Sequence, residues 1–369
     1  MVDIVRFNPE THQREWEDFI VSSYRNQNYV ALSPEFLRWQ FLDNPANTTG
    51  AYTLWLVLHK GVVVAQLGYV PFIGRAPDGK TFDGAYPINL MARPEYRATG
   101  LGVVLLRKLL EETSVVLNPG ANEAGAAVAK GLGMQDLGCL RRYIYVADPE
   151  AARAIALNGR IPSSVMADRR VCDGPNDPAI IITRRLPIGA PETFKPPVPA
   201  YAAERSREYF QWRYGSHPAF VYEFVLSPDL QSVLVFHGER EATSGTLVIR
   251  VVDFLAREEH QEQLLAAALQ TAHARGAAVV DFFCSLECYA AALQRAGFFD
   301  VEEQGDIRIA ALFQPLDFRD ASIRVIVSQP SGAKKWGPGW YITKSDSDQD
   351  RPNDRRAVLG VPIRASVTD

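Results

Sequence analysis

Residues 90–102 read Leu90-Met91-Ala92-Arg93-Pro94-Glu95-Tyr96-Arg97-Ala98-Thr99-Gly100-Leu101-Gly102, and an apolar run to Leu110 follows directly. The pattern predicts a strand that ends near Ala92 and a helix over 102–112. Glycines at 100 and 102 let the backbone turn tightly, so successive N–H groups and the positive helix end can point at one anion. The segment therefore predicts a pyrophosphate-binding turn between a strand and a helix.

Strand and helix signals alternate on both sides of this turn, as they do in α/β proteins. The chain before it predicts a first strand, then a helix, then two strands joined by a tight turn at Lys60-Gly61. We expect the strand over 142–146 to be the last strand of the first half. The full order is strand 2–7, helix 9–24, strands within 54–69, strand through 91, helix 102–112, strand 114–117, helix 122–132 and strand 142–146.

A second half repeats this order after a segment with five prolines between Leu186 and Pro199, which reads as a linker. Three pairs of segments match: 36–41 with 209–214, 89–93 with 253–257, and 132–134 with 296–298. The last two pairs share one offset, 164 residues, which favours a duplication. We predict a first domain over 1–150, a connecting segment over 151–199, a second domain over 200–345 and a polar tail over 346–369.

The run from Arg97 to Gly102 resembles the cofactor loop of the GNAT superfamily of N-acetyltransferases, Arg/Gln-x-x-Gly-x-Gly/Ala after a strand. The resemblance implies two tandem domains, each a mixed, splayed β-sheet flanked by helices. It also implies acetyl-CoA or another acyl-CoA as co-substrate. The amides of residues 97–102 would hold the CoA pyrophosphate, and Leu90, Met91 and Ala92 would face pantetheine. Asn122, where such a helix begins, completes the cofactor site that we expect.

Two other interpretations of the glycine turn stay open. A dinucleotide fingerprint would need a third glycine where Leu105 stands, and it would follow the opening strand of a βαβ unit rather than a meander. A glycine-rich helix start without a ligand is the other alternative. In the second half the start of the corresponding loop, Glu258-Glu259-His260, is followed by neither glycine, so we expect only the first half to bind CoA.

The residues that would do the chemistry are less evident. Many GNAT members use a Tyr as the acid for the leaving thiolate, and that position is Ala129 here. As candidate bases we name Tyr86, Asp253 and Asp346. Asp253 takes the place of Asn89 within an apolar strand, where a carboxylate must find a partner or shift its pKa. Its structural alternative is a bond to a neighbouring Arg or Trp.

Composition limits the partners. The net charge is −4 without a basic track, so no nucleic acid is expected, and no apolar stretch reaches the roughly 20 residues that span a bilayer. Four cysteines lack zinc spacing, and the run from Asp346 to Asp350 departs from a calcium loop at Arg351, so no metal is expected. We expect a cytoplasmic protein, since the N-terminal residues lack signal-peptide order. Its oligomeric state stays open.

The function that we predict is acyl-CoA-dependent N-acyltransfer to a primary amine, without a covalent enzyme intermediate. Motifs around Trp39, Trp212 and Tyr341 look like those of large bacterial GNAT-type proteins associated with surface polysaccharides. That resemblance implies a nucleotide-linked amino sugar as acceptor. The alternatives are a Fem-type transferase that uses aminoacyl-tRNA, and a non-catalytic module that binds acyl-CoA.

Overall fold

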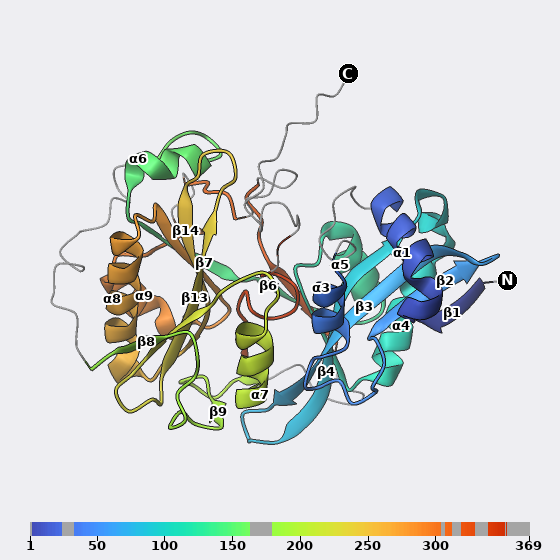
Figure 1. The fold of residues 1–369 in the computed structure, drawn as a ribbon, viewed down its shortest axis with the longest axis horizontal. Helices are drawn as coiled ribbons and strands as arrows, with labels where there is room; N and C mark the ends of the chain where they lie inside the picture. The colour runs from blue at the N-terminus through green and yellow to red at the C-terminus, as the bar shows by residue number, and fades with distance from the viewer. Residues whose placement is uncertain are drawn as a thin grey trace.

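A computed structural model describes residues 2–23, 33–162, 179–303, 307–311, 319–328, 339–350 and 352. Two large β-sheets lie side by side, with helices on their faces (Figure 1). The predicted α/β class, with mixed sheets flanked by helices, is confirmed. Some predicted features lie outside the described residues. They are the end of the first helix at residue 24, the part of the connecting segment over 163–178, Arg351, and the tail over 353–369.

The first sheet has nine strands, seven of which follow one another in the order β1-β2-β3-β4-β5-β17-β6. The turn at Lys60-Gly61 joins β2 to β3 as predicted, and both residues have the positive φ that such hairpins require. A short strand, β10, pairs with β3 and with β18 at one end. The strands are β1 (Val2–Arg6), β2 (Leu54–His59), β3 (Val62–Arg75), β4 (Thr81–Ala92), β5 (Val115–Pro119), β6 (Gln135–Cys139), β10 (Tyr201–Ala203), β17 (Arg324–Val327) and β18 (Trp340–Tyr341).

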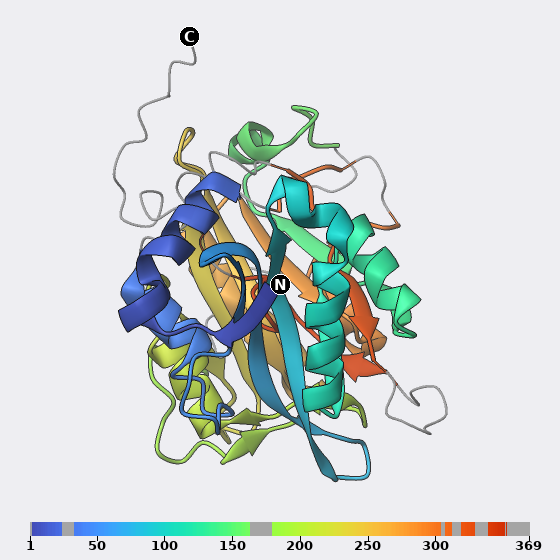
Figure 2. The ribbon, with the colours of Figure 1, turned by 90° about the vertical axis from the view of Figure 1, so that its right-hand side faces the viewer.

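Helices cover both faces of this sheet (Figure 2). Two helices bury their apolar faces against one side, α1 (Pro9–Ser23) with Trp16 and Phe19, and α3 (Pro34–Phe41) with Phe36. On the other side α4 (Leu101–Glu112) and α5 (Glu123–Gly131) pack through leucines and alanines. Because successive side chains of a strand point to opposite faces, the apolar residues of these strands contribute to two separate hydrophobic cores, one on each face of the sheet.

The second sheet has seven strands in the order β16-β7-β15-β14-β13-β12-β8. Its outer face is covered by α8 (Glu258–Ala274) and α9 (Ala290–Arg295), at the left of Figure 1. The strands are β7 (Arg141–Val146), β8 (Ile181–Thr183), β12 (Glu223–Leu226), β13 (Val233–Arg240), β14 (Leu247–Leu255), β15 (Val279–Cys284) and β16 (Phe299–Asp300). Shorter elements are α6 (Pro149–Ala152), α7 (Arg207–Phe210), and a two-stranded ribbon of β9 (Thr193–Phe194) and β11 (Arg205–Ser206).

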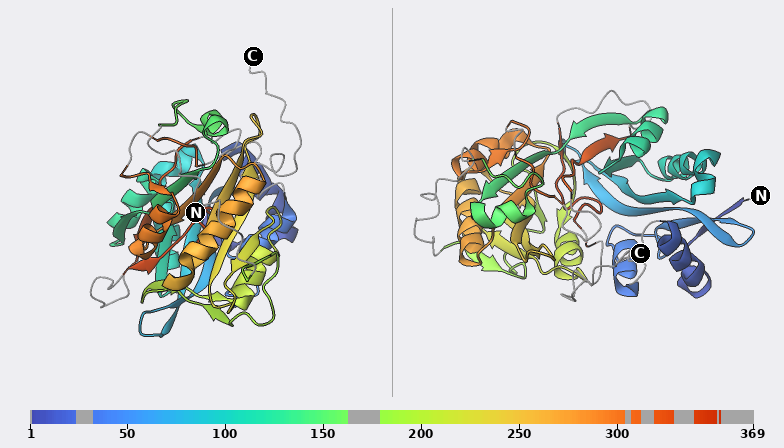
Figure 3. Two further views of the ribbon diagram at one scale, coloured as in Figure 1. Left: turned by 90° about the vertical axis from the view of Figure 1, so that its left-hand side faces the viewer. Right: turned by 90° about the horizontal axis from the view of Figure 1, so that it is seen from above.

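Each half of the chain contributes strands to the sheet of the other half. The strand that we expected to close the first half, β7, pairs with β15 of the second sheet, so that expectation was wrong. In return β17 pairs with both β5 and β6 of the first sheet, where its orange-red ribbon lies among cyan strands (Figure 3, right). Since β8 of the connecting segment also forms the edge of the second sheet, the predicted boundaries at 150 and 200 do not separate the sheets.

The two matched tryptophan segments meet in space. Trp39 of α3 and Trp212, just after α7, stack with ring centroids 5.1 Å apart. Each indole Nε1–H donates to the backbone carbonyl of the other tryptophan, at 2.9 Å in both directions. The reciprocal contact is what a two-fold relation between the halves would produce.

Candidate functional site

Strands β4 and β5 run parallel but separate after a short contact. They pair only at Gly84 with Val115 and at Ala85 with Val116. Beyond Ala85, β4 continues to Ala92 with β3 along one edge, and no β-strand of the described residues pairs with its other edge. A strand edge of this kind offers N–H and C=O groups to an extended, amide-containing ligand.

A β-bulge interrupts β4 within this open stretch. The register with β3 shifts between the pair Gly68–Ile88 and the pair Gln66–Met91, and Asn89 has a φ of 53°. Before the bulge Ile88 points into the core beneath α1 and α3, whereas after it Leu90 packs against the core of α4. The bulge therefore turns Leu90 toward the helix that follows the glycine turn.

The glycine turn leads from β4 into α4 as predicted. After a 3₁₀ turn over Pro94–Thr99, Gly100 takes the left-handed conformation at a φ of 81°, and α4 begins at Leu101. No side chain caps this helix, and a Cβ atom at Gly100 would meet nothing within 4 Å. The first-turn N–H groups thus have no side-chain cap, at the helix end that favours an anion.

The side chains around this turn are exposed from Arg97 to Gly100, while Leu90, Met91 and Ala92 are half-buried on the open edge of β4. The Arg97 side chain turns back, its Nε donating to the Ala92 carbonyl at 3.5 Å. Asn122 caps α5, because its side-chain oxygen accepts from Gly125 N–H at 2.8 Å. Ala129, where the resemblance implied the position of an acid, is a residue of α5 and is fully buried.

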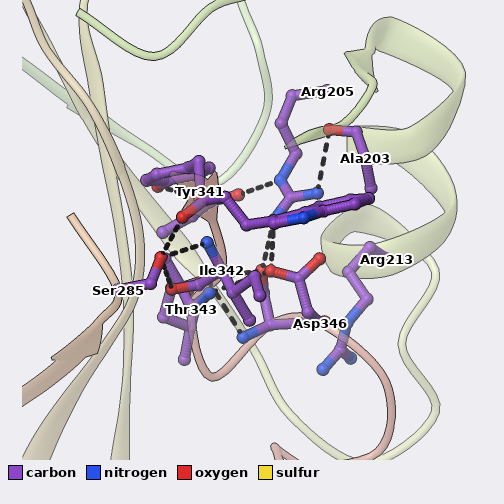
Figure 4. Close-up of polar contacts among 12 residues, drawn as sticks. Ala203, Arg205, Arg213, Ser285, Tyr341, Ile342, Thr343 and Asp346 are labelled. Carbon is purple, nitrogen blue, oxygen red and sulfur yellow. Dashed lines mark hydrogen bonds and ion pairs between the residues drawn. The ribbon is translucent and has the colours of Figure 1, made fainter. Parts of the chain in front are cut away.

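The three candidate bases meet around a residue that the sequence reasoning missed, Arg205. Figure 4 shows Arg205 and Asp346. Its Nε donates to Asp253 at 2.7 Å and its Nη2 to Asp346 at 2.9 Å. The Tyr86 hydroxyl donates to the other oxygen of Asp346 at 2.6 Å, and Tyr214 donates to Asp253 at 2.8 Å. The structural alternative for Asp253, a bond to an arginine, is therefore the one observed.

Burial decides what this cluster can do. Tyr86 is 3% exposed, Asp253 0% and Asp346 2%. Burial, and then the charge of Asp346, raises the pKa of Tyr86 well above 10, so this phenol stays protonated. Burial alone would lower the pKa of Arg205, but the charges of Asp253 and Asp346 outweigh it and raise that pKa. The cluster connects four parts of the chain, and its carboxylates and phenols are buried rather than exposed as bases.

Residues 339–350 form a segment, called the strap here, that runs between the two sheets. We expected residues from 346 onward to be a polar tail, yet Asp346 and Asp350 are 2% and 3% exposed. Their carboxylates are buried because each meets an arginine or a histidine, Arg205 for Asp346 and His237 for Asp350. The polar composition of this segment predicted that it is exposed. It is buried instead, because Asp346 and Asp350 are paired with residues far away in the sequence.

The strap fills the opening of the second sheet. Pairing of β14 with β15 ends at Val251, and beyond that point Tyr341 and Thr343 of the strap occupy the gap. The Tyr341 hydroxyl accepts from Phe254 N–H at 2.9 Å, and the Thr343 hydroxyl donates to the Val252 carbonyl at 2.7 Å. Phe254 aligns with Leu90 in the matched sequence segments, so the strap occupies the part of the second sheet that corresponds to the open edge of β4 in the first.

The other end of the strap reaches the first sheet. The Gln349 amide donates to the Pro119 carbonyl at the end of β5, at 3.1 Å, and the Gln349 side chain packs on Gly120. The strap therefore lines one side of the β4–β5 opening after filling the β14–β15 opening. No helix of the described residues is long and apolar enough to cross a bilayer, and no acidic, His or Cys cluster among them could hold a metal ion.

Comparisons with known proteins agree with this architecture. No protein-family model matches the chain, and no curated protein sequence does. A GCN5-related N-acetyltransferase from Anabaena variabilis superimposes with a TM-score of 0.55 at 11% identity, over 89% of this chain and 72% of that one. One from Kribbella flavida gives 0.54 at 13% identity, over 89% and 70%.

A third solved structure, a conserved protein of unknown function from Enterococcus faecalis described as a probable N-acyltransferase, gives a TM-score of 0.50. Its identity is 9%, over 89% of this chain and 73% of that one. At such identities the likeness concerns the arrangement of helices and strands alone. On that arrangement, this chain has the fold of the GCN5-related N-acetyltransferases.

Proposed function

We propose that this protein is an acyl-CoA-dependent N-acyltransferase whose first half holds the acyl-CoA. The observation that carries the proposal is the open β4 edge that leads to the uncapped start of α4. Pantetheine contains two amides and fits the free edge over Tyr86 to Ala92, while the pyrophosphate fits the amides after Gly100. The second half cannot take a second CoA, because the strap fills its slot and α8 begins with Glu258 and Glu259.

The reaction would transfer an acyl group, by default acetyl, directly to a primary amine. The amine nitrogen bonds to the thioester carbon, the C–S bond breaks, and the electron pair leaves with sulfur. The proton lost by the amine passes to solvent, and the thiolate is protonated from solvent. No buried side chain of the Arg205 cluster serves these steps, which suits an amine that arrives uncharged. A nucleotide-linked amino sugar is the acceptor that the family resemblance suggests.

A non-catalytic acyl-CoA-binding module is the second candidate, and two observations favour it. The position of the family's acid is a buried Ala129. The carboxylates of Asp253 and Asp346 are buried in ion pairs with Arg205, and the buried Tyr86 hydroxyl donates its proton to Asp346. Such a protein would bind acyl-CoA through the same turn without turning it over. The two candidates therefore share the ligand and differ in the release of thiol.

We also infer that the two halves arose by duplication. The shared offset of the matched segments supports this, and so do the reciprocal hydrogen bonds of Trp39 and Trp212. A bulge near the corresponding place in each strand adds to it, between Ile88 and Met91 in β4 and between Val251 and Asp253 in β14. Fusion of two unrelated sheets would have no reason to produce these three correspondences.

Calorimetric titration with acetyl-CoA and with free CoA tests the proposal. Gly100→Glu places a carboxylate and a strained left-handed backbone where the pyrophosphate would lie, so we expect binding to weaken at least about 100-fold. Gly79→Glu is the matched control, since Gly79 also has a positive φ and open surroundings but lies in the β3–β4 turn.

The outcomes separate the candidates. Binding that is lost in Gly100→Glu and kept in Gly79→Glu supports the site, and thiol release with an amine then supports the transferase. Binding without thiol release from any amine favours the non-catalytic module. A wild-type protein that binds neither acetyl-CoA nor longer acyl-CoAs would refute both.

A further inference from the structure

A single buried amide side chain connects helix α1 to the bulge of β4. Gln66 lies in the middle of β3 among apolar neighbours and is 0% exposed. Its oxygen accepts from Trp16 Nε1–H at 2.6 Å, and its nitrogen donates to the Asn89 carbonyl at 3.1 Å. A buried amide is costly unless both its ends are bonded, and here both are.

The second of these bonds sets the orientation of one peptide group. A trans peptide is planar, so its C=O and the following N–H point in opposite directions. Gln66 draws the Asn89 carbonyl toward β3, and Leu90 N–H therefore points away from β3. Since β3 lies along one edge of β4 and the opening lies along the other, Leu90 N–H is directed into the slot.

The second half shows what the corresponding N–H does. Phe254 matches Leu90 in the repeat, follows a bulge in β14, and donates its N–H to the Tyr341 hydroxyl oxygen within the filled slot. The register pairs Gln66 with Met91 and Val233 with Leu255, so an apolar residue stands where Gln66 would be. There the bulge is held instead through Asp253 and its bonds to Arg205 and Tyr214.

We propose that Gln66 is a positioning residue, which holds the Asn89–Leu90 peptide so that Leu90 N–H receives the acyl carbonyl oxygen. The inference rests on the proposed acyl-CoA site. As the amine bonds to the carbonyl carbon, negative charge develops on that oxygen, and an N–H already directed at it stabilises the charge without reorganisation. When the C–S bond breaks, the charge leaves with sulfur and the carbonyl reforms.

A pair of variants isolates the bond to Asn89. Gln66→Met keeps the volume but loses both hydrogen bonds, whereas Trp16→Phe loses only the Trp16–Gln66 bond. We expect Gln66→Met to lower kcat for thiol release about 10- to 100-fold more than Trp16→Phe does, with the Kd for acetyl-CoA within about threefold of wild type. A merely structural role of Gln66 would instead affect both variants alike and would weaken binding as much as turnover.

A second experiment, NMR spectroscopy of the Leu90 amide, requires neither turnover nor a variant of Gln66. In protein labelled with ¹⁵N-leucine, the NMR signal of the Leu90 amide is assigned as the one that disappears in Leu90→Ile. We expect the chemical shift of this signal to change when acetyl-CoA binds and to change little when free CoA binds. Two results would refute the role of Gln66 and leave the CoA site in place, provided that acetyl-CoA binds. One is a Leu90 signal that responds equally to acetyl-CoA and free CoA, and the other is an equal kcat for Gln66→Met and Trp16→Phe. If acetyl-CoA does not bind, the proposed function fails first.

Discussion

Arg205 is the residue on which the candidate bases depend. It lies between the carboxylates of Asp253 and Asp346 at 1% exposure, and it is the shared partner that keeps both carboxylates in the interior. Its guanidinium also lies over the Tyr209 ring, 4.7 Å from the centroid. Because a buried charge without its partner is very costly, a cluster of this kind is sensitive to the loss of one member.

We therefore expect Arg205→Met to lower the free energy of unfolding by about 3–5 kcal/mol, since two buried carboxylates lose their counter-charge. Urea unfolding would measure the change. Arg257→Met is the matched control, because Arg257 pairs with Asp229 at 51% and 42% side-chain exposure, and it should cost less than about 1 kcal/mol. Equal effects of the two substitutions would contradict a structural role for Arg205.

At the scale of elements, the contact between α3 and the turn after α7 joins the two halves. The indoles of Trp39 and Trp212 are 6% and 8% exposed, and each bonds to the backbone of the other. His217 packs edge-on against Trp39 at 4.4 Å between centroids. Two hydrogen bonds and a stacked pair thus depend on both tryptophans at once.

A double-mutant cycle tests this dependence. Trp39→Phe and Trp212→Phe each remove one indole donor, and we expect a coupling energy of about 0.5–3 kcal/mol between them in urea unfolding, as for residues in direct contact. Trp55 lies in the other core of the first sheet, so Trp39→Phe with Trp55→Phe should be additive within about 0.5 kcal/mol. Additivity in the Trp39–Trp212 pair would argue that the reciprocal bonds contribute nothing jointly.

At the scale of the whole molecule, the exchange of β7 and β17 makes each sheet depend on chain from the other half. The second sheet needs β7, which follows β6 of the first sheet after a single residue, Leu140. The first sheet needs β17 to bridge β5 and β6. The strap adds bonds to both sheets through Tyr341 and Gln349.

These connections predict one cooperative unfolding transition for both halves. Scanning calorimetry should give a van't Hoff enthalpy equal to the calorimetric enthalpy within error, because neither sheet is complete once the other has unfolded. Two resolved transitions, or a van't Hoff enthalpy near half the calorimetric value, would show that the halves unfold separately in spite of the exchange.

Much of the local structure was predictable from the sequence. The turn at Lys60-Gly61, the strand-to-helix turn at Gly100 and the alternation of strands and helices each depend on neighbours within a few residues. Backbone sterics and side-chain periodicity act at that range. Gln66, a polar residue inside an apolar strand, was a visible signal of a special position that the sequence reasoning passed over.

The rest depended on contacts between distant parts of the chain. The residues of β7 have the pattern of a strand, but that pattern does not say which sheet edge the strand joins. The polar residues of the strap indicate exposure, but Arg205 and His237, from elsewhere in the chain, are the partners that allow Asp346 and Asp350 to be buried. The sequence by itself thus determined the fold class and the glycine turn between β4 and α4. Only the tertiary structure decided that the strap fills the second slot, because hydrogen bonds and ion pairs between distant residues leave no local pattern.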